Sequence, residues 1–106
     1  MSRNTNAVPQ VTKDPVERIP LGWDWTGALE AGDSIDSSNW AIETTEVSPD
    51  LEVDAGSDSI DVPNNKTAVR VINGTLGETY LLVNTITTTP GAHTHVRRIE
   101  IRIQTK

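Results

Sequence analysis

Residues 96–104 read VRRIEIRIQ and carry the most regular pattern in the chain. Isoleucine recurs at every second position from Ile99 to Ile103, and charged or amide side chains fill the positions between. Side chains of an extended strand alternate between its two faces, so this pattern predicts a strand with one face in a core and one in water.

A second long strand is predicted just before it, from Tyr80 to Thr88, within the stretch GETYLLVNTITT of residues 77–88. A tyrosine at the start of such a strand, three residues after Gly77, is typical of a tyrosine corner. In that corner the phenol oxygen hydrogen-bonds a backbone group a few residues upstream and pins the crossing between two sheets.

The tyrosine corner also decides which side of this strand faces the core. It places Tyr80 and every second residue after it on the inner face, so that Asn84 faces inward. Leu81 and Val83 then face outward, where the N-terminal segment covers them or they form a contact patch. The opposite phase would bury Leu81 and Val83 and leave Tyr80 at the surface.

Five more strands are predicted upstream, separated by turn signals at a spacing of about ten residues. They cover residues 19–25, 35–43, 51–53, 59–62 and 66–72. No stretch of 12 or more residues holds a helical period, although one helical turn is expected around Leu29. The predicted fold is all-β, an immunoglobulin-like Greek-key β-sandwich of about seven strands with Trp40 as its central core residue.

The length of 106 residues fits one domain. Residues 1–16 are polar, contain Pro9 and Pro15, and show neither a strand nor a helix period. We expect them to form an extended N-terminal arm, and residues 17–106 to form the domain.

Composition excludes several classes of function. The net charge of −6 argues against a nucleic-acid binder. There is no cysteine, no signal-peptide pattern and no apolar stretch near the roughly 20 residues that span a bilayer, so we expect no membrane partner. Eleven acidic and no basic residues lie between Ile19 and Asn65, whereas residues 66–106 carry six basic and two acidic residues. This pattern indicates either solvated strand faces or two oppositely charged sides.

The sequence predicts no enzyme. It has no nucleophile elbow, no phosphate loop and no candidate catalytic, cofactor-binding or metal-binding set. His93 and His95 would lie on one side of an extended chain, and one chain offers only two such ligands, so a metal would need several copies. The turns with Asp54, Asp58 and Asp61 lack the spacing of a known calcium loop.

Two stretches resemble small virion proteins of tailed phages and prophages. In that group a DW…L…GD.I..S.W stretch precedes a GETYTLTNTITT-like strand and a final basic, isoleucine-rich strand. Residues 22–42, GWDWTGALEAGDSIDSSNWAI, and residues 77–88 match it. The matching positions are Trp25, Leu29, Gly32, Asp33, Ile35, Trp40, Gly77, Tyr80, Asn84, Ile86 and Thr88.

Such proteins are commonly described as fibre–tail adaptors or other small virion proteins with an immunoglobulin-like fold. The chain departs from them in having Leu81 and Val83 where the group tends to threonine, in a longer acidic middle, and in the loop of residues 90–95. The predicted fold-defining residues are Trp25, Leu29, Trp40, Gly77, Tyr80, Ile86, Ile99, Ile101 and Ile103. The candidate interface residues are Leu81, Val83, Arg98 and Arg102.

The resemblance implies a non-enzymatic structural component of a bacteriophage particle that acts as a tail or neck adaptor of the fibre–tail type. The alternatives are a capsid decoration protein and a receptor- or carbohydrate-binding module, the last with Trp23 and Trp25 as a sugar platform. Expected partners are tail, neck, fibre or major capsid proteins and copies of the chain itself. The expected location is the virion, made and assembled in the host cytoplasm, with no cofactor.

Overall fold

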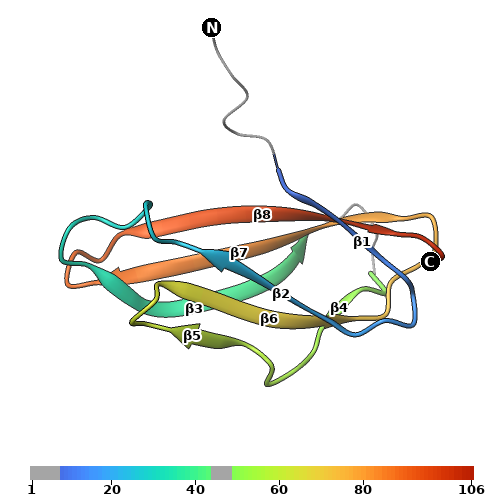
Figure 1. Cartoon of the computed structure of the whole chain (residues 1–106), viewed down its shortest axis with the longest axis horizontal. Coiled ribbons are helices and arrows are strands. Elements are labelled where there is room, and N and C mark those ends of the chain that lie inside the picture. The colour runs from blue at the N-terminus through green and yellow to red at the C-terminus, as the bar shows by residue number, and fades with distance from the viewer. Residues whose placement is uncertain (1–7, 44–48) are drawn as a thin grey trace, which may run out of the picture.

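The computed structural model describes residues 8–43 and 49–106, which form strands joined by turns and contain no helix (Figure 1). The expected helical turn at Leu29 is therefore wrong, and residues 26–29 form turns closed by a hydrogen bond of 2.9 Å from Ala28 N to Trp25 O. The strands are β1 (Gln10–Lys13), β2 (Ile19–Asp24), β3 (Ser34–Glu43), β4 (Glu52–Val53), β5 (Ser59–Asp61), β6 (Lys66–Ile72), β7 (Thr79–Thr89) and β8 (Thr94–Ile103).

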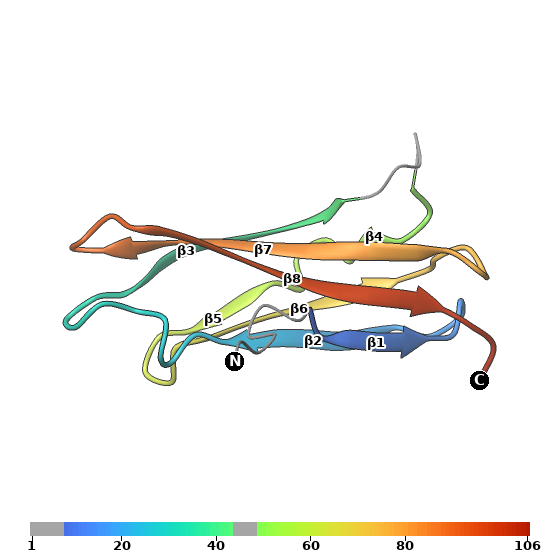
Figure 2. The same cartoon turned by 90° about the horizontal axis from the view of Figure 1, so that it is seen from above.

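The strands form two sheets. Sheet A has the order β1-β8-β7-β3, and sheet B has the order β2-β6-β4 with β5 also paired to β6. All neighbours are antiparallel except β1, which runs parallel to β8. The strands of both sheets run along the long axis of the molecule (Figure 2). An all-β fold of two sheets was predicted, and the strand at Pro20 is an edge of sheet B as expected.

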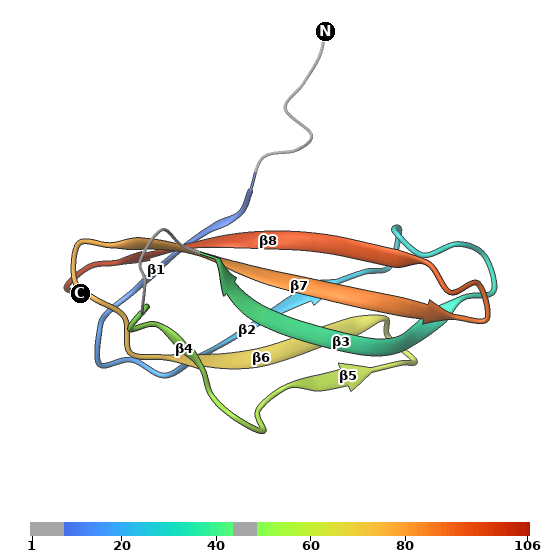
Figure 3. The same ribbon diagram turned by 180° about the vertical axis from the view of Figure 1, so that it is seen from behind.

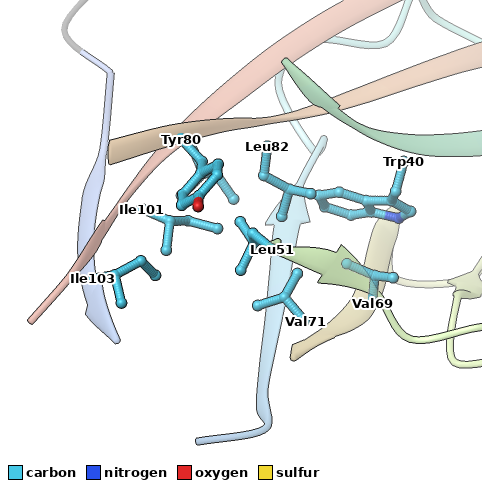
Figure 4. Packing of buried hydrophobic residues seen from close by; sticks show 9 residues of the cluster. Trp40, Leu51, Val69, Val71, Tyr80, Leu82, Ile101 and Ile103 are labelled. Carbon is cyan, nitrogen blue, oxygen red and sulfur yellow. The ribbon is translucent and has the colours of Figure 1, made fainter. Parts of the chain in front are cut away.

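The core lies between the inner faces of the two sheets. Tyr80 and Leu82 of β7 and Trp40 of β3 face Val69 and Val71 of β6 (Figure 4). A smaller cluster joins three further buried side chains, Trp25, Ile35 and Ile86. The alternation seen in residues 99–103 is the inner face of β8: Ile99, Ile101 and Ile103 are all buried. Burying such branched side chains is the main driving force for this fold.

The phase of β7 is the one that the tyrosine corner required. Tyr80 is buried, and its phenol oxygen accepts a hydrogen bond of 3.2 Å from the backbone N–H of Thr75. Gly77 lies in the intervening turn with φ of +89°, a conformation that residues with a side chain rarely adopt. The turn is held to β8 by the hydrogen bond of 2.9 Å from Gly77 N to Ile103 O.

A buried polar network joins the two sheets at Asn84. The Oδ1 atom of Asn84 accepts hydrogen bonds from Trp25 Nε1 at 3.1 Å and from Thr67 Oγ1 at 2.6 Å. Its Nδ2 atom donates to Ser38 Oγ at 2.9 Å and to the Asn39 carbonyl at 3.1 Å. Because Trp25 and Thr67 belong to the sheet B side and Ser38 and Asn39 to β3, one amide connects both layers.

Strand β1 differs from the expectation that no regular element precedes Ile19. Gln10–Lys13 lies in the segment that we expected to be an arm, and it extends sheet A by pairing with Glu100–Ile103. Val11 packs against the core cluster. A strand of four residues is too short for its period to stand out, which explains why the sequence did not reveal it. Residues 1–7 of the expected arm lie outside the described residues.

The strand is anchored by Lys13, whose side chain is fully buried. Its ammonium group donates hydrogen bonds to the backbone carbonyls of Asp14, at 3.0 Å, and of Asn73. Loss of hydration on burial lowers the pKa of Lys13, and the nearby carboxylates of Glu17, Asp14 and Asp50 oppose that shift. The lysine thereby ties the end of β1 to the turn between β6 and β7.

We predict that Asn84→Ala lowers the free energy of unfolding by about 2–4 kcal/mol, because it leaves a cavity and removes the partners of buried donors. Urea denaturation of the purified protein measures this change. Asn39→Ala is the matched control, since the Asn39 side chain is exposed, and it should cost no more than about 0.5 kcal/mol. Equal losses for the two variants would contradict a structural role of the Asn84 amide.

Candidate docking surface

The outer face of sheet A brings together the four candidate interface residues. Alternation along β7 places Leu81 and Val83 opposite the buried Tyr80 and Leu82. In the register of the sheet Val83 lies between Ala41 of β3 and Arg98 of β8. We define the outer face by Ala41, Leu81, Val83, Val96, Arg98 and Arg102.

The centre of this face is apolar and open to solvent. Ala41 is exposed, Val96 is 37% exposed, and Leu81 and Val83 are half-buried. Thr85 and Thr87 continue the row of Leu81 and Val83 along β7. Small and branched side chains on a β-sheet give a flat surface, which suits contact with another flat protein surface.

Two ion pairs lie on this face. The first crosses β7 on the register that joins Arg98 to Val83 and Glu43 to Leu81, and the second lies on β8 beside Leu81. Arg98 Nε lies 3.1 Å from Glu43 Oε1, and Arg102 Nε lies 3.5 Å from Glu100 Oε1. All four side chains are partly exposed, so these pairs contribute little to the stability of the fold. Their charges remain available to a partner that approaches the face.

The described part of the N-terminal segment does not cover Leu81 and Val83. Strand β1 lies beside β8, with Gln10 opposite Glu100 and Thr12 opposite Arg102. It therefore widens sheet A at its edge rather than lying over β7. Leu81 and Val83 were expected either to be covered by the N-terminal segment or to form a contact patch. The position of residues 8–13 favours the contact patch.

The tryptophans do not form the platform that a carbohydrate-binding module would need. Trp25 is fully buried, and Trp23 is half-buried against both core clusters. Their ring centroids lie 6.3 Å apart, and the guanidinium of Arg97 lies 5.3 Å from the centroid of the Trp25 ring. Trp23 and Trp25 thus belong to the end of the core, which speaks against the carbohydrate-binding alternative and agrees with Trp25 as a fold-defining residue.

His93 and His95 lie near each other at the hairpin between β7 and β8, with ring centroids 6.3 Å apart. His93 Nδ1 donates to Asp33 Oδ2 at 2.9 Å, and Thr88 Oγ1 donates to the same oxygen at 2.9 Å. The Asp33 side chain is 5% exposed and also accepts from Gly91 N. Here His93 and Asp33 join this hairpin to the loop between β2 and β3.

The aspartate-rich turns have partners of another kind. Asp54 Oδ2 lies 3.1 Å from Arg18 and 2.7 Å from Arg70, and Asp61 accepts a hydrogen bond from Asn64. Residues 8–43 and 49–106 contain no group of three or more histidine, cysteine or carboxylate side chains that could hold a metal ion.

A family model described as "Podophage GP4 fiber-tail adaptor protein gp77" matches residues 13–102 of the chain. The chain belongs to this family. The match spans both sheets, every candidate interface residue and all predicted fold-defining residues except Ile103. No curated protein and no solved structure matched the chain.

The family assignment confirms the first of the predicted roles. The chain is a phage fibre–tail adaptor, a structural component of the virion that binds other virion proteins. No helix within the described ranges is long and apolar enough to cross a membrane.

Sequence reasoning missed two features of the adaptor. The first is the burial of Lys13. A lysine at the end of a polar segment gives no sign in the sequence that it will be buried. The second is the network around Asn84: the inner phase of Asn84 was predicted, but its partners Trp25 and Thr67 are distant in sequence. An asparagine at an inward position was the available signal, because a buried amide must find partners.

We predict that the adaptor loses stability as the pH falls below about 4, partly through Asp33. Hydrogen bonds from His93, Thr88 and Gly91 hold the pKa of Asp33 below its usual value. This stabilisation is present above the unfolded-state pKa of about 3.9 and is lost as the pH falls through the lower folded-state pKa. Denaturation between pH 6 and pH 3 should show a shallower loss for Asp33→Asn than for the wild type. Identical slopes would contradict this role of Asp33.

Proposed function

We propose that the adaptor works without catalysis and docks on its tail or fibre partner through the outer face of sheet A. The observation that carries this proposal is the pair of outward aliphatic side chains at Leu81 and Val83, with the exposed Arg98–Glu43 ion pair spanning β7 between them. Protein interfaces combine an apolar core with a polar rim, and roughly 800 Å² per partner is enough for a stable contact.

The charges on this face give such a contact its orientation. Arg98 and Arg102 can exchange their present carboxylate partners for acidic groups of another protein, and Glu43 and Glu100 can do the same for basic groups. Complementary charges of this kind contribute more to specificity and association rate than to affinity. The apolar centre would supply most of the binding energy.

We further propose that the fold is an immunoglobulin-like Greek-key sandwich. The strand order β1-β8-β7-β3 opposite β2-β6-β4 supports this, since the chain crosses from one sheet to the other after β1, β2, β3 and β6. The inward Trp40 of β3 and the hydrogen-bonded Tyr80 of β7 occupy the positions typical of that fold. In this arrangement the predicted fold-defining residues are buried hydrophobic side chains, apart from Gly77 in the turn before β7. Leu29 is half-buried and packs against the smaller core cluster.

In this proposal residues 1–16 form the arm, residues 17–106 form the domain, and β1 is the point at which the arm joins sheet A. Copies of the adaptor also associate with one another, and assembly takes place in the host cytoplasm. The charge separation along the sequence supports self-association only in part. Arg70 and Arg98 already pair with Asp54 and Glu43 within one chain, which leaves fewer charges for a neighbour.

We predict that Leu81→Lys weakens binding to the purified tail and fibre proteins of the same phage about tenfold or more, because it places a charge in the apolar centre. The lysine lies opposite Glu43 and Glu100, so the fold should tolerate it. Leu76→Lys is the matched control: Leu76 is 56% exposed in the turn before β7, and this variant should bind like the wild type. Equal binding by both variants would refute docking through this face.

Self-association has its own test in sedimentation velocity of the purified adaptor at several salt concentrations. Because contact between oppositely charged surfaces is screened by salt, larger species should be present at 20 mM salt and decline at 500 mM. A monomer at all concentrations and salt levels would contradict self-association and leave docking on tail or fibre proteins unaffected.

A further inference from the structure

Strand β3 is a long edge of sheet A, and no described strand pairs with the side of β3 that faces away from β7. It runs over ten residues, Ser34–Glu43, and hydrogen-bonds within sheet A to β7 alone. The other sheet places β4 and β5 below it (Figure 3), but neither pairs with it. The backbone N–H and C=O groups on the free side of β3 therefore form a template for another strand.

The other sheet edges in the described part of the chain are protected against such pairing. Strand β1 has four residues and follows Pro9, and β2 carries Pro20, which has no N–H to donate. Strands β4 and β5 have two and three residues. In contrast, residues 37–42 of β3, SSNWAI, follow a bulge and contain neither a proline nor a charge. Natural proteins usually protect edges, so one long unprotected edge points to a use.

A pocket of about 180 Å³ lies beside this edge. Its wall on sheet A is the middle of β3, residues 38–40, and its wall on sheet B is the turn between β4 and β5. Gly56 in that turn has open space around its α carbon, and Ala55 is exposed. The pocket can therefore accept a side chain from a strand that adds to β3.

Two further observations indicate what such a strand carries. Trp40, which borders the pocket, is 8% exposed, and its Nε1 atom is buried without a hydrogen-bond acceptor among the described residues. The carboxylates of Asp36 and Asp58 are exposed at this edge and form no ion pair with a described residue. Both observations fit one kind of partner segment. It would carry an oxygen acceptor that enters the pocket and a lysine or arginine that pairs with these carboxylates.

We propose that the β3 edge of the adaptor captures an extended, basic segment of a tail or fibre protein by β-strand addition. The segment continues sheet A beyond β3, places one polar side chain in the pocket beside Trp40, and pairs its basic residues with Asp36 and Asp58. Main-chain hydrogen bonds supply affinity in this mode, and the side-chain pocket supplies specificity. The inference rests on the proposed adaptor role and gives the adaptor a second contact surface, next to the outer face.

The test combines a filled pocket with amide exchange in the assembled complex. Ala55→Trp fills the pocket without changing the outer face, and Ala31→Trp is the matched control, since Ala31 is exposed and lies outside the pocket. The probes are the purified tail complex and the purified fibre protein of the same phage. We expect Ala55→Trp to bind one of them at least tenfold more weakly than Ala31→Trp, with both variants melting like the wild type.

Hydrogen exchange of the wild-type adaptor then reports on the edge itself. Amides of residues 37–42 that exchange fast in the free protein should exchange at least tenfold more slowly in the complex with the same partner. Unchanged exchange there, or equal binding by the two tryptophan variants, would overturn the inference while the adaptor role stands. Protection that arises in the purified adaptor alone and grows with its concentration would also overturn it, because the occupant would be a second copy. Binding of the wild type to neither probe would refute the proposed function itself.

Discussion

The side-chain amide of Asn84 determines which side of β7 faces the core. It lies in the middle of the central pair of strands in sheet A and exchanges hydrogen bonds with Trp25, Thr67, Ser38 and the backbone of Asn39. A strand has a period of two, so a shift by one residue would move this amide into water and leave its buried partners unpaired. The tyrosine corner at Tyr80 imposes the same phase from the other end of the strand.

The outer face is a consequence of that phase. With Asn84 and Tyr80 inside, Leu81 and Val83 must be outside, although they are more hydrophobic than Asn84. Exposing two aliphatic residues and burying an amide runs against simple hydrophobic sorting. The arrangement is stable because every donor and acceptor of the amide is paired, and it gives the adaptor an apolar surface without weakening its core.

An adaptor has to hold two partners, and sheet A offers two surfaces that differ in chemistry. The outer face combines aliphatic side chains with exposed ion pairs, one of which crosses β7, whereas the β3 edge offers backbone hydrogen bonds and a small polar pocket. The two meet along β3, where Ala41 belongs to the face and the free backbone belongs to the edge. The opposite edge of sheet A is the short strand β1, which the buried Lys13 holds in place.

The sequence alone determined the all-β class, strands β2 to β8 nearly to their ends, the inner phase of β7 and the outward position of the four candidate interface residues. Period-two alternation and turn residues are local signals, so they can be recognised in a single sequence. The tertiary structure decided the pairing of β1 with β8, the burial of Lys13 and Trp25, the partners of Asn84 and the pocket beside β3. Several of these features join residues that are far apart in the sequence, such as Lys13 with Asn73 and Gln10 with Glu100. Such contacts exist only after two sheets have closed over one another, and no local pattern encodes which distant atoms then meet.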